Sequence, residues 1–141
     1  MVMRILYDTS ALFKRYNDEP GREQVLALGA GASDVVVAAH CRSEIASAIN
    51  RQRHDGLVSA LDYARIMAVV HADFADFSRM DLDERVEAFA IAAMERTWLR
   101  AMDALHIGTA LAARVDLFVT ADRRQALAAQ TAGLKTELIG A

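Results

Sequence analysis

Apolar residues recur along the chain in two patterns that separate strand-like from helix-like segments. The runs Ile5–Tyr7 and Val35–Val37 are continuous, as in strands that are buried on both faces. Between such runs, apolar positions return every three or four residues, which is the period of an amphipathic helix. The predicted strands are 4–7, 34–38, 117–120 and 136–139, with a short edge strand within 77–82. The predicted helices are 9–16, 22–28, 43–53, 57–75, 83–99, 103–114 and 123–131.

The alternation of these strands and helices predicts the fold class. It implies a parallel sheet with helices on both faces and right-handed crossovers. We therefore expect an α/β fold, an α/β/α sandwich around a mostly parallel central sheet of about five strands. The length of 141 residues suits one domain covering 1–141. In the helix over 57–75, Leu61, Ala64, Met67 and Ala68 are expected to lie along one face.

Composition narrows the class of protein. Apolar residues make up 54% and charged residues 25%, which is typical of a globular domain. No apolar run approaches the roughly 20 residues that cross a bilayer, and Asp8 precedes any possible signal-peptide core. The single Cys41 cannot form an internal disulfide. We therefore expect a cytoplasmic protein with no membrane association. The formal net charge of −3 argues against a general nucleic-acid coat protein.

Four acidic residues occupy equivalent places in the predicted topology. Asp8 directly follows one predicted strand, and Asp122 comes two residues after the end of another. Glu44 lies in the first turn of a predicted helix, and Asp103 begins another. Strand ends of one polarity meet at one edge of a parallel sheet, where ligands bind. Converging carboxylates repel each other unless a cation lies between them, and their oxygens suit Mg²⁺ or Mn²⁺. A metal site is therefore predicted at these four residues.

Taken singly, each acid also has an ordinary structural explanation. Asp8 and Asp122 are good helix N-caps, and Glu44 in a first helical turn complements the helix dipole. Thr9 and Ser10 could support a ligand at Asp8 or simply begin a helix. These separate explanations account poorly for the fact that all four acids occupy equivalent positions in the predicted topology.

Other chemistry-bearing residues carry weaker signals. The four histidines lack zinc-ligand spacing, and His106 is interpreted as a packed or hydrogen-bonding helix residue rather than a ligand. Cys41 is interpreted as a small buried hydrophobe. Basic residues flank the acids in sequence and could hold the phosphates of a polyanion, although an ordinary charged surface would look the same. They are Lys14, Arg15, Arg42, Arg51, Arg53, Arg123 and Arg124.

With these residues in view, the chain resembles PIN-domain proteins and is most similar to the VapC-type toxins of bacterial toxin–antitoxin pairs. The resemblance covers essentially the whole chain. It rests on Tyr7-Asp8-Thr9-Ser10-Ala11-Leu12, Ser43-Glu44-Ile45, Asp103-Ala104-Leu105-His106-Ile107 and Val119-Thr120-Ala121-Asp122. The segment between the second and third motifs carries little family signature, so no target surface can be transferred there.

The resemblance implies a metal-dependent endoribonuclease that serves as the toxin of a type II pair. Asp8, Glu44, Asp103 and Asp122 would be the metal ligands and catalytic residues for Mg²⁺ or Mn²⁺. A metal-activated water would cleave RNA and leave 5′-phosphate and 3′-hydroxyl ends. The partner would be a VapB-type antitoxin that blocks the site. Thr9, Ser10 and Thr120 would be supporting groups.

Two further functions and two further expectations accompany the endoribonuclease assignment. Arg123 and Arg124 are expected to be the residues that bind RNA. A non-catalytic PIN-like regulatory module, or another metal-dependent phosphohydrolase acting on DNA, would be compatible with the same acids. A homodimer is also expected, because helices 57–75 and 83–99 carry more apolar surface than one sheet face covers. The residues that suggest this surface are Met67, Val70, Phe74, Phe77, Met94 and Trp98.

Overall fold

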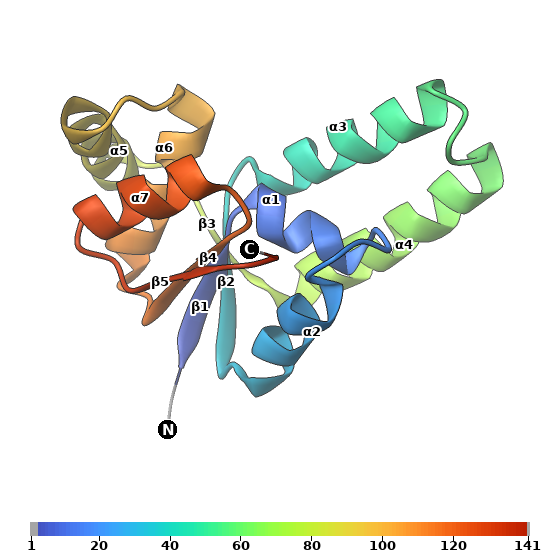
Figure 1. Cartoon of the computed structure of the whole chain (residues 1–141), viewed down its shortest axis with the longest axis horizontal. Helices are drawn as coiled ribbons and strands as arrows, with labels where there is room; N and C mark the ends of the chain where they lie inside the picture. Colours follow the sequence, from blue (N-terminus) through green and yellow to red (C-terminus); the bar gives the residue numbers. More distant parts are fainter. Residues whose placement is uncertain (1–2, 141) are drawn as a thin grey trace.

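The computed structural model, which describes residues 3–140, is built around a sheet of five parallel strands (Figure 1). In spatial order the strands run β3-β2-β1-β4-β5. Their bounds are β1 Arg4–Tyr7, β2 Asp34–Ala38, β3 Ser78–Met80, β4 Leu117–Thr120 and β5 Thr136–Leu138. The central strand pairs on both sides, with Ile5 opposite Val35 and Leu117. The predicted parallel sheet and its edge strand within 77–82 are confirmed.

Helices cover both faces of this sheet. Their bounds are α1 Thr9–Leu12, which continues as the 3₁₀ turn η1 Phe13–Arg15, then α2 Arg22–Gly31, α3 Cys41–His54, α4 Ala60–Asp76, α5 Glu84–Arg96, α6 Ala101–Ala113 and α7 Arg123–Thr131. Side chains alternate across a strand, so Ile5 and Tyr7 join the core beneath α1–α4. Leu6 joins the opposite core beneath α5–α7. The α/β/α sandwich is confirmed.

The strand order reverses beside β1. The chain first builds outward from β1 to β2 and β3, and then returns to the other side of β1 for β4 and β5. The boundary between β1 and β4 is therefore a topological switch point, and ligands bind outside the carboxyl ends of strands at such points. Asp8 follows β1 there, and its amide donates a hydrogen bond to the carbonyl of Val119 in β4, at 3.0 Å.

Helices α3 and α4 extend beyond the sheet as an arm (Figure 1). Only the part of α4 nearest the sheet is buried, through Met67, Val70 and Phe74. Of the four residues that the sequence placed along one face of this helix, only Met67 is buried. Leu61 is 61% exposed, and Ala64 and Ala68 are exposed too.

The surface expected to form a homodimer is smaller than the sequence suggested. Met67, Val70 and Phe74 complete the core of the single chain, whereas Trp98 is 74% exposed. Trp98 lies in the turn between α5 and α6. The homodimer itself stays a prediction. Within residues 3–140, no helix is both long enough and apolar enough to cross a membrane.

Candidate metal centre

Asp8 is fixed in place by two of the three hydroxyls predicted as supporting groups, those of Ser10 and Thr120, whereas the third, Thr9, donates to Glu44. Its Oδ1 accepts hydrogen bonds from the Ser10 hydroxyl at 2.7 Å and from the Ala11 amide at 3.0 Å. Its Oδ2 accepts one from the Thr120 hydroxyl at 2.6 Å. Burial raises the pKa of Asp8 by more than His106 and these hydrogen bonds lower it. A cation beside this carboxylate would favour the ionised form and reverse that balance.

Glu44 is held through one of its two carboxylate oxygens. Oε1 accepts a hydrogen bond from the Thr9 hydroxyl at 2.6 Å and lies 2.8 Å from Nε2 of His106. An ionised carboxylate only accepts, so Nε2 of His106 carries the proton. Burial raises the pKa of Glu44, but the hydrogen bonds from His106 and Thr9 and nearby histidine charge outweigh it, and the net shift is downward. Oε2 has no hydrogen-bond partner among residues 3–140, which leaves it available to a cation.

Asp103 and Asp122 lie together where α6 and α7 begin. Both line a concave pocket of about 150 Å³. Gln125 joins the two helices there, because its Nε2 donates to the main-chain carbonyl of Asp103 at 2.8 Å. Burial raises the pKa of Asp103, His106 and Arg100 lower it, and the charges of Asp122 and Glu44 raise it further. The negative charges of Asp122 and Glu44 therefore add to burial in disfavouring the ionised form of Asp103.

The convergence of the four acids is incomplete in geometric terms. Within the described part of the chain, the group whose possible ligand atoms all lie within 4.8 Å of one another is His40, Glu44 and His106. No three of the four predicted acids approach one another that closely there. The prediction that the four acids share one cation therefore stays a prediction. Carboxylate oxygens outnumber nitrogen donors at this edge, and such a donor set fits Mg²⁺ or Mn²⁺.

The structural explanations for two of the acids are also correct. Asp8 caps α1 through Oδ1, and Asp122 caps α7 through Oδ1, which accepts from the amides of Arg124 and Gln125. Capping by Asp122 uses one carboxylate oxygen. Its Oδ2 has no hydrogen-bond partner in the described chain, so capping and metal binding are compatible at this residue.

Two histidines contact Glu44 at this site, although neither was predicted to be part of it. His106 is 2% exposed, and it both packs and donates a hydrogen bond, as interpreted from the sequence. Nε2 of His40 lies 3.4 Å from the same Glu44 oxygen and 2.9 Å from the carbonyl of Met102. Helical spacing was the available signal, because His106 follows Asp103 by three residues and His40 precedes Glu44 by four.

Cys41 begins α3 next to this cluster and behaves as the sequence predicted. Its side chain is fully buried, and burial raises the pKa of the thiol to about 12. A buried thiol that stays protonated at neutral pH is a poor nucleophile.

The basic residues divide into engaged and free groups. Nζ of Lys14 pairs with Glu19 at 2.8 Å, and Nε of Arg15 pairs with Asp73 at 2.8 Å. Both residues are therefore engaged by carboxylates of the same chain, which leaves them less available to a phosphate. Arg123 and Arg124 are exposed at the start of α7. Neither forms an ion pair with a carboxylate within residues 3–140.

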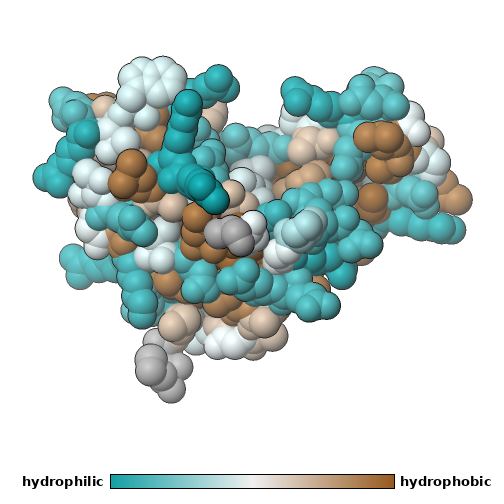
Figure 2. All heavy atoms as spheres, in the orientation of Figure 1, coloured by the Kyte–Doolittle hydropathy of each residue, from teal (hydrophilic) through white to brown (hydrophobic). Residues whose placement is uncertain are grey.

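The surface around the acids is hollowed. Figure 2 shows a depression between the side formed by α5–α7 and the α3–α4 arm. The acids come from both sides of it, because Glu44 belongs to α3 while Asp103 and Asp122 lie at the beginnings of α6 and α7.

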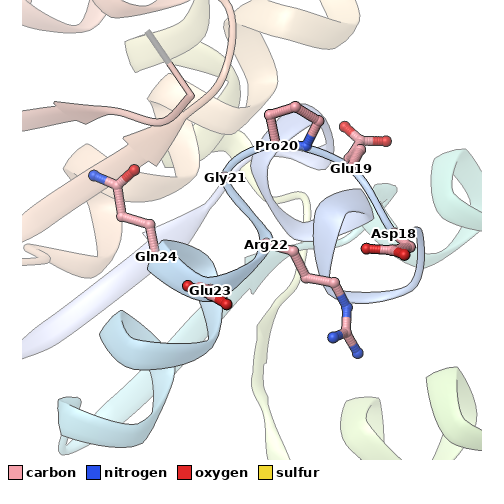
Figure 3. Close-up of a pocket in the computed structure, with 7 residues that line it drawn as sticks. All are labelled: Asp18, Glu19, Pro20, Gly21, Arg22, Glu23 and Gln24. Carbon is pink, nitrogen blue, oxygen red and sulfur yellow. The ribbon is translucent and has the colours of Figure 1, made fainter.

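A larger hollow of about 690 Å³ lies elsewhere, where the loop after η1 leads into α2 (Figure 3). It is lined by consecutive residues from Asp18 in the loop to Gln24 in the first turn of α2. Their side chains spread in different directions and do not point toward a common centre. Ligand sites need polar groups that converge, so the acidic edge is the better candidate.

Solved structures with the same fold come from several organisms. VapC20 of Mycobacterium tuberculosis, a sarcin-ricin loop cleaving toxin, superposes with a TM-score of 0.67 at 16% identity, over 88% of this chain and 94% of that one. VapBC2 of Rickettsia felis, bound to a DNA fragment from its promoter, gives 0.69 at 12% identity, over 97% and 99%. FitAcB of Neisseria gonorrhoeae gives 0.66 at 19% identity, over 94% and 95%.

At such low identities these likenesses establish the fold. No curated protein sequence matches the chain. Membership of a family comes from the sequence itself, because residues 5–130 match the PIN domain. That span contains Asp8, Glu44, Asp103 and Asp122, together with their supporting hydroxyls. The chain belongs to the PIN domain family.

Proposed function

We propose that this protein is a metal-dependent endoribonuclease and the toxin of a type II toxin–antitoxin pair. The observation that supports this most strongly is the arrangement at the switch point of the sheet. There, donors from other elements fix Asp8 and Glu44, and Asp103 and Asp122 line one pocket beside them. The four acids would hold Mg²⁺ or Mn²⁺ and act as the catalytic residues.

The protein's own contribution is to hold these groups in place before substrate arrives. Thr9 and His106 restrict Glu44 to one orientation, while Ser10 and Thr120 do the same for Asp8. Groups fixed in advance need no reorganisation when charge develops on a phosphate. When bound, the cation would neutralise that charge and activate a water for attack on the phosphodiester. Nε2 of His106 donates to Glu44, so we assign this imidazole to holding the carboxylate and not to removing a proton.

A cleavage assay tests this proposal against the two alternatives. Purified protein is incubated with single-stranded RNA, single-stranded DNA or a small phosphate ester, in Mg²⁺ or in EDTA. The proposal expects RNA to be cut in Mg²⁺, and cleavage to stop in EDTA and return when Mg²⁺ is restored. Cleavage that persists in EDTA would contradict the metal mechanism. Preferred cleavage of DNA would favour the phosphohydrolase, and no cleavage in Mg²⁺ or Mn²⁺ would favour the non-catalytic module.

A VapB-type antitoxin is the proposed partner in the cytoplasm. Structural neighbours include a toxin–antitoxin complex from Klebsiella pneumoniae, which shares 17% identity with this chain and gives a TM-score of 0.64. The acids at the strand ends would attract a basic side chain from such a partner, because an arginine pairs with a carboxylate through two parallel hydrogen bonds. A basic group placed there would also exclude the cation.

Arg123 and Arg124 are the proposed contacts to the phosphates of RNA. Replacing both with alanine should raise the KM for RNA while the affinity for Mn²⁺ changes little, since a guanidinium is not a metal ligand. Each lost phosphate contact should also reduce the slope of log affinity against log salt by about 0.7. Cleavage rates measured over a range of RNA and salt concentrations provide both quantities.

The matched control for this double variant removes the same charge elsewhere. Arg79 lies in the edge strand β3 and Arg85 in the first turn of α5, and both are exposed. Changing this pair to alanine should leave KM and the salt slope close to wild type. If both double variants behave alike, only the overall charge of the protein matters, and Arg123 and Arg124 have no specific part in binding.

A further inference from the structure

Trp98 stands on the surface directly beside the candidate metal centre. It lies in the turn between α5 and α6, and its side chain is 74% exposed. A single exposed apolar residue is ordinary on a protein surface. The position is what distinguishes Trp98, because its indole lines the same 150 Å³ pocket as Asp103 and Asp122.

Two cationic side chains also belong to the residues that line this pocket. Arg100 and Arg124 are both exposed there. Neither forms an ion pair with a carboxylate in the part of the chain that the structure describes. One small hollow thus contains an aromatic face, two free guanidinium groups and two of the acids proposed to hold the cation. An aromatic face binds a nucleobase by stacking, and arginine binds the phosphates on either side of it.

Gln125 also lines this pocket. It is 2% exposed, and its Nε2 donates to the main-chain carbonyl of Asp103 at 2.8 Å. This bond joins the beginnings of α6 and α7, so the groups around the pocket are held by two packed helices.

From this arrangement we infer that Trp98 is the stacking platform for one unpaired base of the substrate, next to the phosphate that is cut. The inference rests on the proposed nuclease function and adds to it a residue that binds a base of the substrate. Bases in a duplex are already stacked and cannot reach the indole face, whereas an unpaired base can. The arginines on either side favour a polyanion as occupant over an apolar protein surface.

The chain contains only one tryptophan, so its intrinsic fluorescence reports on Trp98 alone. The experiment titrates wild-type protein, with Ca²⁺ in place of Mg²⁺, with an unstructured RNA of six nucleotides. We expect quenching of the emission that saturates with RNA concentration. The same sequence annealed into a duplex should leave the emission nearly unchanged. Equal quenching by both forms would overturn the inference.

Variants at this position provide the second measurement. In a competition assay with labelled RNA, Trp98→Ala should weaken binding about 5- to 150-fold, which corresponds to about 1–3 kcal/mol per stacked base. Trp98→Phe should restore most of the affinity. Leu57→Ala is the matched control, since Leu57 is 75% exposed but precedes the α4 arm, and it should bind RNA like wild type. Thermal melts should show all three variants folded, because both residues are exposed.

The outcomes separate this inference from the nuclease proposal. If RNA is cut but Trp98→Ala keeps wild-type affinity and KM, the stacking platform is wrong and the nuclease stands. Quenching and weakened binding without cleavage under any divalent cation would leave the platform standing and reject the nuclease. If Trp98→Ala instead converts a dimer into a monomer and leaves RNA affinity unchanged, Trp98 belongs to an interface between two copies of the chain.

Discussion

Replacing Asp103 with asparagine should reduce Mg²⁺-dependent RNA cleavage by at least about 100-fold. Residues that only support a metal ligand are worth roughly 10- to 100-fold, and losing an anionic ligand should cost no less. Asparagine keeps the shape of the side chain and the main-chain carbonyl that accepts from Gln125. The loss should therefore appear in cleavage and in Mn²⁺ affinity measured by calorimetry, while the fold is retained.

The matched control for this variant is Asp62→Asn. Asp62 also lies in the first turn of a helix, α4, but it is exposed on the arm. Its change should leave cleavage and Mn²⁺ affinity at the wild-type level. If Asp103→Asn retains normal Mn²⁺ affinity, Asp103 is not a ligand, whatever happens to cleavage.

The stability of metal-free Asp103→Asn should depend on pH in a defined direction. The pKa of Asp103 is raised above its ordinary value of 3.8, mainly by burial. Between the ordinary pKa of the unfolded chain and the raised pKa of the folded protein, Asp103 binds more protons in the folded state. The free energy of unfolding therefore falls as the pH rises through this interval. Asparagine does not titrate. The variant should be at least as stable as metal-free wild type at neutral pH, and this advantage should disappear in acid below the ordinary value.

Gly108→Ala should destabilise the protein by about 2 kcal/mol and lower its Tm by roughly 6–10 °C. Helices α5 and α6 cross closely at this glycine, which is fully within α6. A Cβ atom there would lie 2.9 Å from the amide nitrogen of Ala90 and closer still to the carbonyl oxygen of Val86. Both are backbone atoms, so relief requires the helices to separate. Alanine's better helix propensity recovers only about 1 kcal/mol of this cost.

Gly31→Ala is a control in which the same substitution is expected not to lower the stability of the protein. Gly31 is an exposed residue at the end of α2, and a Cβ atom there meets nothing within 4 Å. This variant should be as stable as wild type or more stable by up to about 1 kcal/mol. Urea unfolding of both variants measures the difference. A Gly108→Ala protein as stable as Gly31→Ala would show that α5 and α6 do not pack as closely as described.

The position of Gly108 illustrates what the sequence could not indicate. A glycine within an apolar helical pattern indicates at most a close approach, and the partner helix is set by the path of the chain. The same limit applies to α4. Its apolar residues recur with helical period, yet Met67 is buried while Leu61 is 61% exposed. Periodicity identifies a face but does not say how far the sheet extends beneath it.

The residues of the candidate site also differ in whether the local sequence could identify them. Asp8 with its hydroxyl neighbours, and Asp103 at the start of a helix, could be recognised from local sequence, because strand ends and helix starts follow from nearby residues. The contacts of His106 and Trp98 could not. His106 meets Glu44 across 62 positions of sequence, and the pocket beside Trp98 exists only because α6 and α7 begin at the same place.

By itself, the sequence determined the alternating strands and helices, the parallel sheet and the identity of the four acids. These depend on local periodicity and on residue types whose chemistry is evident without a fold. The tertiary structure alone decided the strand order β3-β2-β1-β4-β5, and therefore which strand ends meet at the switch point. It also decided which cations remain free, since Lys14 and Arg15 are engaged by Glu19 and Asp73. Contacts between distant segments depend on packing of the whole chain, which no local pattern specifies.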